Sequence, residues 1–167
     1  MIDKLTPAAR SRNMGRIGSK NTSPELTVRR VFHRFGLRYR LHVKDLPGKP
    51  DIVLVSRRTC VFVHGCFWHG CPHCSEGRRV VGSNQTYWLP KLAGNKARDE
   101  RHAAALAAAG WRVELVWECE ARNERLLAEL AKKLLAIPSM KAGLLQAARV
   151  DRKNIGPAHR GRRRDRD

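Results

Sequence analysis

The sequence predicts an α/β fold in which a central mixed β-sheet is flanked by helices. Two apolar segments, residues 51–55 and 60–64, are joined by a short polar turn and predict an antiparallel pair of buried strands. A long helical segment then leads into a third apolar run at residues 112–117. A strand, a helix and a strand in that order favour a right-handed crossover to a parallel neighbour, so the sheet should be mixed.

The first clear helix begins at Ser23, which we expect to be its N-cap, with Pro24 in the first turn. Gly36 should end it. Glu25 lies in the first turn, where a carboxylate interacts favourably with the positive end of the helix dipole. Its position alone therefore favours a purely structural role for Glu25.

An alternating segment at residues 37–42 predicts a half-exposed strand, and the Pro- and Gly-rich residues 46–50 predict a loop. The pair of buried strands follows. In an antiparallel pair the start of the first strand lies beside the end of the second. Asp51 and His64 should therefore converge at one end of the sheet.

The second half of the chain predicts an irregular stretch at residues 75–89, a helix at 90–109, a strand at 112–117 and an amphipathic helix at 122–136. Both ends of the chain are basic. We expect residues 1–22 to form an arm that clamps DNA, residues 23–137 to form the folded core, and residues 138–167 to be a partly disordered basic tail. The alternative for the arm is a frayed terminus with scattered charge.

A cysteine-rich segment follows the second buried strand. Cys66, Cys71 and Cys74 have the spacing C-x4-C-x2-C, and a two-residue gap lets both thiolates reach one tetrahedral ion. Cys119 is the expected fourth ligand, and His73 is an alternative ligand within the segment. Buried free thiols would be the alternative interpretation. Three cysteines in a polar segment broken by Gly and Pro favour a structural zinc.

The composition points to a cytoplasmic partner of nucleic acid. The chain has 34 Lys and Arg against 15 Asp and Glu, a formal net charge of +19, which predicts attraction to phosphate. An odd number of cysteines, five, argues against a disulfide framework. No apolar run approaches the ~20 residues of a membrane span, and the N-terminus lacks the apolar core of a signal peptide. A basic ribosomal-type protein would have a similar charge.

The converging carboxylates and imidazoles suggest hydrolytic chemistry. Asp51, with Glu25 nearby, could hold Mg²⁺ through carboxylate oxygens, water and a phosphate. His64 or His69 could accept a proton near neutral pH. The alternative is that Asp51 is a turn residue and the imidazoles are spare zinc ligands.

Several motifs together resemble the very short patch repair endonuclease family, the bacterial mismatch nickases. They extend over about residues 6–136 and comprise Arg12-Asn13-Met14, Pro47-Gly48-Lys49-Pro50-Asp51, His64-Gly65-Cys66-Phe67-Trp68-His69, Tyr87-Trp88, Gly110-Trp111-Arg112-Val113 and Trp117-Glu118-Cys119. The resemblance implies a restriction-endonuclease-like fold with a zinc site outside the catalytic centre. It also implies Mg²⁺-dependent nicking beside the T of a T·G mismatch left by deamination of 5-methylcytosine.

The resemblance also implies roles for individual residues. Asp51 is similar to the family's metal-binding carboxylate, helped by the backbone carbonyl of Val63. Glu25 and His64 resemble the outer groups that hold metal-bound waters. His69 resembles the general base and Asp99 its acidic partner. Where related nucleases carry Glu-x-Lys, this chain has Phe62-Val63-His64, a substitution that the mismatch nickases share.

For DNA, the resemblance implies an aromatic wedge of Phe67, Trp68 and Trp88 and a clamp that includes Met14. A wedge has a physical rationale, because a mismatched base step is the least costly one to open. We therefore expect a monomer that acts on double-stranded DNA with a T·G mismatch, associated with the bacterial nucleoid, with mismatch-repair proteins as candidate partners and no membrane association. The alternative is a zinc-stabilised, non-catalytic DNA-binding module.

Overall fold

The computed structural model describes residues 20–140 of the chain. Its elements are α2 (Ser23–Arg34), β1 (Arg40–Leu41), β2 (Ile52–Leu54), the 3-10 turn η1 (Val55–Arg57), β3 (Thr59–His64), α3 (Cys66–His69), α4 (Gln85–Ala108), β4 (Arg112–Trp117), α5 (Glu118–Ala121) and α6 (Glu124–Ala136). Met14, nearly all of the predicted arm and nearly all of the predicted tail lie outside the described residues. None of the helices within residues 20–140 combines the length and apolar character of a membrane span.

The sheet is mixed, as predicted, with strand order β1-β2-β3-β4. The first two pairings are antiparallel, and β3 pairs with β4 in parallel. Helix α4 makes the crossover between the two parallel strands. Residues Val63 and His64, at the end of β3, lie opposite Val116 and Trp117 of β4. The predicted α/β class is confirmed.

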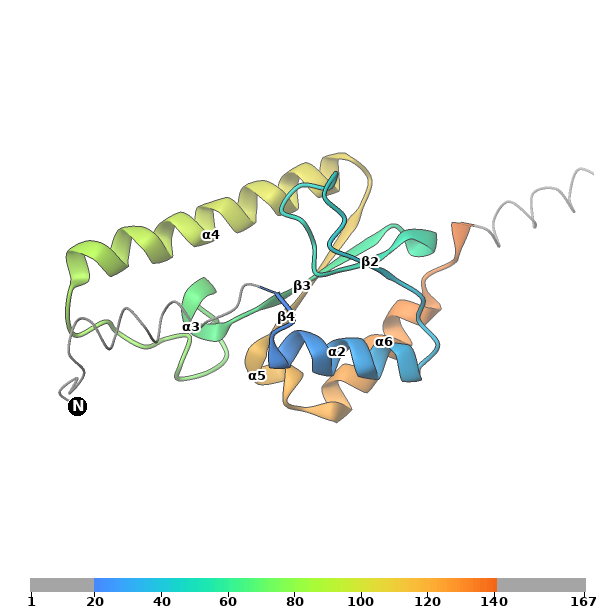
Figure 1. Cartoon of the computed structure of the whole chain (residues 1–167), viewed down its shortest axis with the longest axis horizontal. Coiled ribbons are helices and arrows are strands. Elements are labelled where there is room, and N and C mark those ends of the chain that lie inside the picture. Colours follow the sequence, from blue (N-terminus) through green and yellow to red (C-terminus); the bar gives the residue numbers. More distant parts are fainter. Residues whose placement is uncertain (1–19, 141–167) are drawn as a thin grey trace, which may run out of the picture.

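Helices cover the two faces of the sheet unequally. Helices α2, α5 and α6 lie together on one face, and α4 runs over the other (Figure 1). The larger apolar core lies on the first face, where Phe32 of α2 and Leu134 of α6 belong to the same cluster as Ile52 of β2. The core beneath α4 is smaller and is built around Val53, Cys60 and Leu106.

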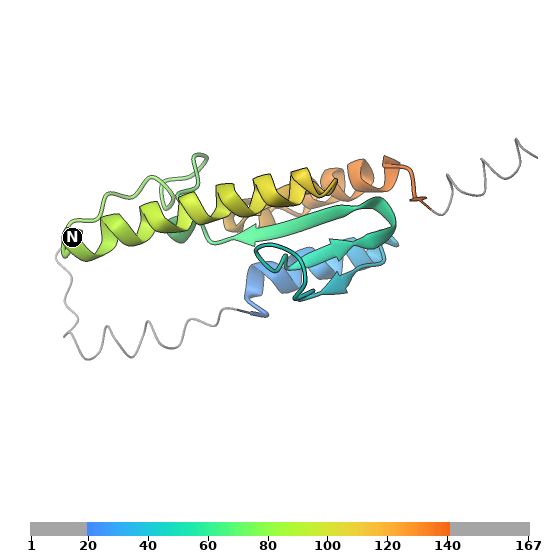
Figure 2. The same ribbon diagram turned by 90° about the horizontal axis from the view of Figure 1, so that it is seen from above.

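Helix α4 is buried only near its C-terminal end, where Leu106 is its one buried residue. Seen from above, the N-terminal half of the helix extends beyond the end of the sheet, and this half lies near α3 (Figure 2). The N-terminal half of the helix packs against α3 instead, and several of its residues line a cleft.

Some element boundaries differ from the prediction. Helix α4 begins at Gln85 rather than at Pro90, which lies inside the helix. A proline is costly within a helix, but here the turn that precedes Pro90 presents Trp88 to the aromatic residues of α3. The N-cap of α2 is Thr22 rather than Ser23, because Thr22 forms a capping box with Glu25. The predicted strand at residues 37–42 is paired only at Arg40–Leu41.

Candidate active site

A cleft of about 1220 Å³ lies at the end of the sheet where β2 begins and β3 ends. Its walls come from the start of α2, the loop before β2, the end of β3, α3 and the exposed half of α4. All five residues with a predicted catalytic role line it: Glu25, Asp51, His64, His69 and Asp99. The fold therefore brings together residues that are widely separated in the sequence.

Asp51 sits immediately before β2 and contacts the neighbouring strand. Its Oδ2 accepts a hydrogen bond from the backbone N–H of Val63 at 2.8 Å. Burial raises the pKa of Asp51, the Val63 bond opposes this shift, and the nearby Glu25 carboxylate raises the pKa further. The convergence of Asp51 with the end of β3 follows from the strand pairing, as the sequence predicted.

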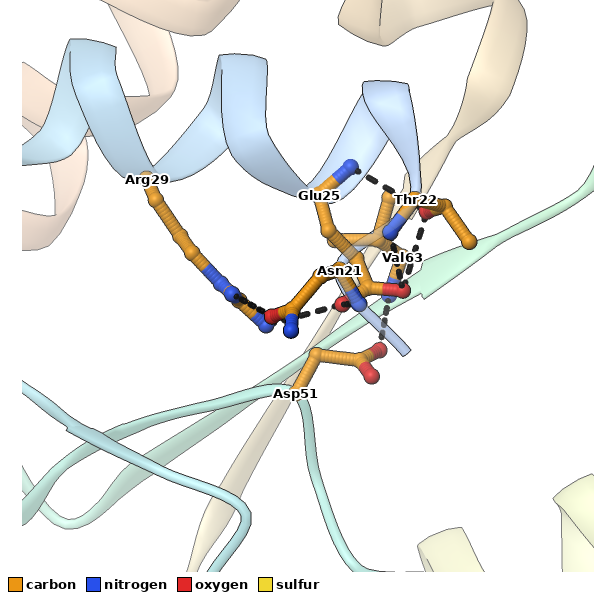
Figure 3. A network of polar contacts seen from close by, with 6 residues as sticks. All are labelled: Asn21, Thr22, Glu25, Arg29, Asp51 and Val63. Atoms are coloured by element: carbon orange, nitrogen blue, oxygen red, sulfur yellow. Dashed lines mark hydrogen bonds and ion pairs between the residues drawn. The ribbon is translucent and has the colours of Figure 1, made fainter. Parts of the chain in front are cut away.

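Glu25 is buried and tightly hydrogen-bonded. Its Oε1 accepts from the Thr22 hydroxyl at 2.9 Å and the Thr22 N–H at 3.4 Å. Its Oε2 accepts from the Asn21 N–H at 3.0 Å and from Arg29 Nη2 at 2.8 Å. Figure 3 shows this carboxylate, carried by α2, close to that of Asp51 at the sheet end. Two carboxylates and one guanidinium therefore share this corner of the cleft.

Two histidines and one aspartate form a second group of residues in the cleft. His69 Nδ1 lies 2.5 Å from Asp99 Oδ2, and the rings of His64 and His69 stack with centroids 3.9 Å apart. His64 Nδ1 is 3.9 Å from the same Asp99 oxygen. Burial and the neighbouring His69 lower the pKa of His64 to about 4, against the opposing effect of Asp99. A carboxylate that holds Nδ1 of an imidazole leaves Nε2 free to accept a proton.

Aromatic side chains from α3 and α4 form a cluster beside these residues. Trp88 packs against Phe67 and Trp68, each with its ring centroid 5.7 Å away. The Lys91 ammonium lies 5.7 Å from the Trp68 ring and 5.6 Å from the Trp88 ring, so it is a cation over an aromatic surface. The structure therefore brings the three predicted wedge residues together. The position of Lys91 beside Trp88 does not follow from the predicted helix start at Pro90, because that start leaves Trp88 outside the helix and hides the i, i+3 relation of the two residues.

The four predicted cysteine ligands form one cluster. The Sγ atoms all lie within 4.8 Å of one another; they belong to Cys66, Cys71, Cys74 and Cys119. Four thiolates at ~2.3 Å from a tetrahedral Zn²⁺ would be about 3.8 Å apart, and the Cys71 and Cys119 sulfurs are separated by 3.8 Å. The donor set and its spacing thus fit zinc. Within residues 20–140, the His73 imidazole is not part of this group.

Backbone N–H groups already face the sulfurs. The N–H of Cys119 donates to Cys66 Sγ, that of His73 to Cys71 Sγ and that of Gly77 to Cys74 Sγ, each at 3.4 Å. Such bonds orient the ligands, as outer contacts do in metal sites. The remaining cysteine, Cys60, is buried beneath α4, and burial raises its pKa to about 11.

One short helix links the cysteine cluster to the cleft. Helix α3 has only four residues, and all of them are site candidates: Cys66, Phe67, Trp68 and His69. A helix of one turn is not stable by itself in water. The sulfur cluster at its first residue and the Asp99 contact at its last residue therefore hold the aromatic residues between them.

Comparison with known proteins finds similarity to DNA mismatch endonucleases and nicking enzymes. The family model described as DNA mismatch endonuclease Vsr matches residues 2–76. The Type II nicking enzyme V.XorIIP of Xanthomonas oryzae pv. oryzae is 54% identical over 120 residues, which cover 72% of this chain and 87% of that protein. The Type II nicking enzyme V.NmeAIP of Neisseria meningitidis serogroup A is 42% identical over 135 residues, or 81% and 95% of the two chains. The DNA mismatch endonuclease Vsr of Escherichia coli (strain K12) is 37% identical over 131 residues, or 78% and 83%.

Proposed function

The chain belongs to the DNA mismatch endonuclease Vsr family and is a mismatch nicking endonuclease, and we propose that it cuts one strand beside the T of a T·G mismatch in a Mg²⁺-dependent reaction. Such a mismatch arises when 5-methylcytosine is deaminated, so the nick would initiate very short patch repair. The observation that carries the proposal is a single cleft lined by the Asp51 carboxylate and the hydrogen-bonded pair of His69 and Asp99.

Asp51 and the backbone carbonyl of Val63 would hold the Mg²⁺. The donor chemistry fits, because Mg²⁺ prefers oxygen ligands and keeps several waters. Only Oδ2 of Asp51 is engaged within residues 20–140, by the Val63 N–H, so Oδ1 can face a ligand in the cleft. When bound, the metal would activate water and neutralise the leaving oxygen of the phosphodiester.

The side chains around this position would divide the proton chemistry. His69 is the proposed general base, acting through Nε2 while Asp99 holds Nδ1. His64 and Glu25 would orient water within the cleft. The low pKa of His64, about 4, keeps that imidazole neutral and able to accept a hydrogen bond near neutral pH.

The aromatic cluster is the proposed wedge. Phe67, Trp68 and Trp88 present contiguous ring surface beside the catalytic residues. Inserting such surface into a base step costs a few kcal/mol, and this cost is lowest at a mismatched step. We propose that Met14, the rest of the basic arm and the basic tail clamp the DNA around this wedge.

We propose that the four cysteines bind one structural Zn²⁺ outside the catalytic centre. The ion would join α3, the loop after it and α5, and would therefore hold the wedge and the base in place. The protein would act as a monomer on DNA in the bacterial cytoplasm and nucleoid, where mismatch-repair proteins are the candidate partners.

A plasmid with one T·G pair tests the proposal. The full chain should convert the supercoiled form to the open circle in Mg²⁺, and sequencing should place the break beside the T. The same plasmid with a T·A pair, and the mismatched plasmid in EDTA, are the controls. Mismatch-selective binding with no break in any divalent metal would instead identify a zinc-stabilised DNA-binding module.

A further inference from the structure

Arg29 is the one buried cation at the metal-facing corner of the cleft within the described residues, and the proposed mechanism gives it no role. It lies one turn after Glu25 on α2, and the two side chains are only 8% and 4% exposed. Nη2 pairs with Glu25 Oε2 at 2.8 Å, and Nη1 donates to Asn21 Oδ1 at 2.6 Å (Figure 3). A guanidinium this deeply buried cannot serve as a free contact for DNA phosphate.

Asn21 closes the arrangement into a ring. Its backbone adopts a left-handed conformation, with φ of 56°, which Asn tolerates better than most residues. In this conformation its N–H donates to Glu25 Oε2 while its side chain accepts from Arg29. The planar fork of arginine can bridge two acceptors in fixed directions, whereas a lysine ammonium acts as a point charge.

The consequence for Glu25 is that its acceptor capacity is already used. A carboxylate has about four lone-pair sites, and Glu25 receives four hydrogen bonds, from Asn21, Arg29 and twice from Thr22. The longest of these, from the Thr22 N–H at 3.4 Å, is the one that a water could most easily replace. Glu25 can therefore hold a water but is not free to coordinate a metal directly.

Helix stability alone does not account for the ion pair of Arg29 with Glu25, because the capping box of Thr22 and Glu25 already stabilises the start of α2. Buried ion pairs often stabilise a fold no better than apolar side chains of similar volume. Moreover, Arg29 Nε is buried without a hydrogen-bond partner among residues 20–140, which adds a cost. The ion pair also cancels one of the two negative charges that Glu25 and Asp51 would otherwise place side by side.

We propose that Arg29 is a positioning residue that keeps Glu25 out of direct contact with the catalytic metal, so that Asp51 remains the carboxylate that binds it. This inference rests on the proposed function. Without Arg29, a second, unpaired carboxylate would face the metal. The metal should then bind more tightly but in the wrong coordination.

The test measures metal binding and catalysis separately in Arg29→Met, an unbranched replacement of similar length. Mn²⁺ binding to the zinc-loaded full chain, followed by electron paramagnetic resonance without DNA, should tighten about tenfold or more, because an opposing unit charge is lost from a poorly solvated site. Single-turnover nicking of a T·G duplex at saturating Mg²⁺ should slow by about 10²-fold, because small misplacements at a reacting centre have effects of this size.

Two variants serve as controls. Arg30→Met removes the same charge from the same helix, but the Arg30 side chain is exposed, and its hydrogen bonds within residues 20–140 are to Leu26 and Thr27 of the same helix. It should change neither quantity by more than about twofold, since exposed charges are well screened. Arg29→Lys keeps the charge beside Glu25 and should restore most of the wild-type metal affinity. If Arg29→Met does not fold, the neutral Arg29→Gln is judged by the same criteria.

Opposite changes in affinity and rate would support the proposal. A folded Arg29→Met or Arg29→Gln protein that matches Arg30→Met in both measurements would overturn it. So would a loss of Mn²⁺ affinity in parallel with a lower melting temperature, because that is the result of a merely structural role. If the wild type binds Mn²⁺ at Asp51 but does not nick, the proposed function fails while the Mn²⁺ affinities still decide the role of Arg29.

Discussion

Replacing Asp99 with Asn tests the proposed base most directly. The substitution conserves size but removes the charge that faces His69 Nδ1 at 2.5 Å. Asn can present its oxygen to Nδ1–H, which keeps the imidazole in place, or its amide, which donates to Nδ1 and moves the imidazole proton to Nε2. In the second arrangement the nitrogen that faces the cleft can no longer accept a proton.

The size of the effect follows from these two arrangements. A hydrogen bond to a charged group contributes about 1.5–3 kcal/mol, which corresponds to a rate loss of about 10- to 150-fold at ~1.36 kcal/mol per tenfold. Reversing the tautomer removes general base catalysis altogether and would extend the loss toward about 10⁴-fold. We therefore expect Asp99→Asn to slow the chemical step by at least about tenfold.

The assay is single-turnover nicking of one T·G duplex at saturating enzyme and Mg²⁺, with duplex affinity measured separately in Ca²⁺. Affinity should be retained, because the substitution removes a negative charge that faces phosphate. Glu100→Gln is the matched control, since Glu100 is the exposed neighbour of Asp99 on α4. If Asp99→Asn nicks as fast as the wild type and Glu100→Gln, the pair of His69 and Asp99 does not supply the base.

The other predictions concern the catalytic metal, the zinc and the wedge. Asp51→Ala should abolish conversion of supercoiled to open-circular DNA. It should keep or tighten T·G binding in a titration, because the carboxylate that it removes repels phosphate. Nicking at the wild-type rate would show that the active site lies elsewhere. Cys119→Ala should lose the zinc found by elemental analysis and unfold without a cooperative transition, since structural zinc contributes about 10–16 kcal/mol in small peptides and whole domains are stable by about 5–15. Cys60→Ala should keep one zinc per chain, and equal zinc contents for these two variants would contradict the cysteine assignment. Trp68→Ala should reduce the preference for a T·G over a T·A duplex before it affects Mg²⁺ dependence, and an unchanged preference would exclude Trp68 from the wedge.

Local spacing in the sequence is enough to predict several features. The two apolar runs at residues 51–55 and 60–64, joined by a short polar turn, predict an antiparallel pair, and that geometry brings Asp51 to the end of β3. The spacing of Cys66, Cys71 and Cys74 likewise predicts that the three thiolates can reach one metal ion. Such patterns involve few intervening residues, so the chain has little freedom to separate their members.

Contacts between distant residues depend on the tertiary structure. His69 and Asp99 are 30 residues apart, and Cys71 and Cys119 are 48 apart. The resemblance implied the first contact, and Cys119 was the expected fourth zinc ligand, but no periodicity in the residues predicts either contact. Both contacts depend on how α4 crosses the sheet and where β4 ends, which are set by packing over the whole domain.

Packing overrode one local signal and added to another. The proline at position 90 predicts a helix start, yet α4 begins at Gln85, and its first turns bring Trp88 to Phe67 and Trp68. Glu25 keeps the role at the helix start that its position predicts, as part of the capping box. Its contacts with the buried Arg29 and the neighbouring Asp51 arise only when α2 is placed against the end of the sheet. A proline inside a helix costs about 3 kcal/mol, and other residues cost about 1 kcal/mol or less. Contacts formed across the fold can outweigh these costs.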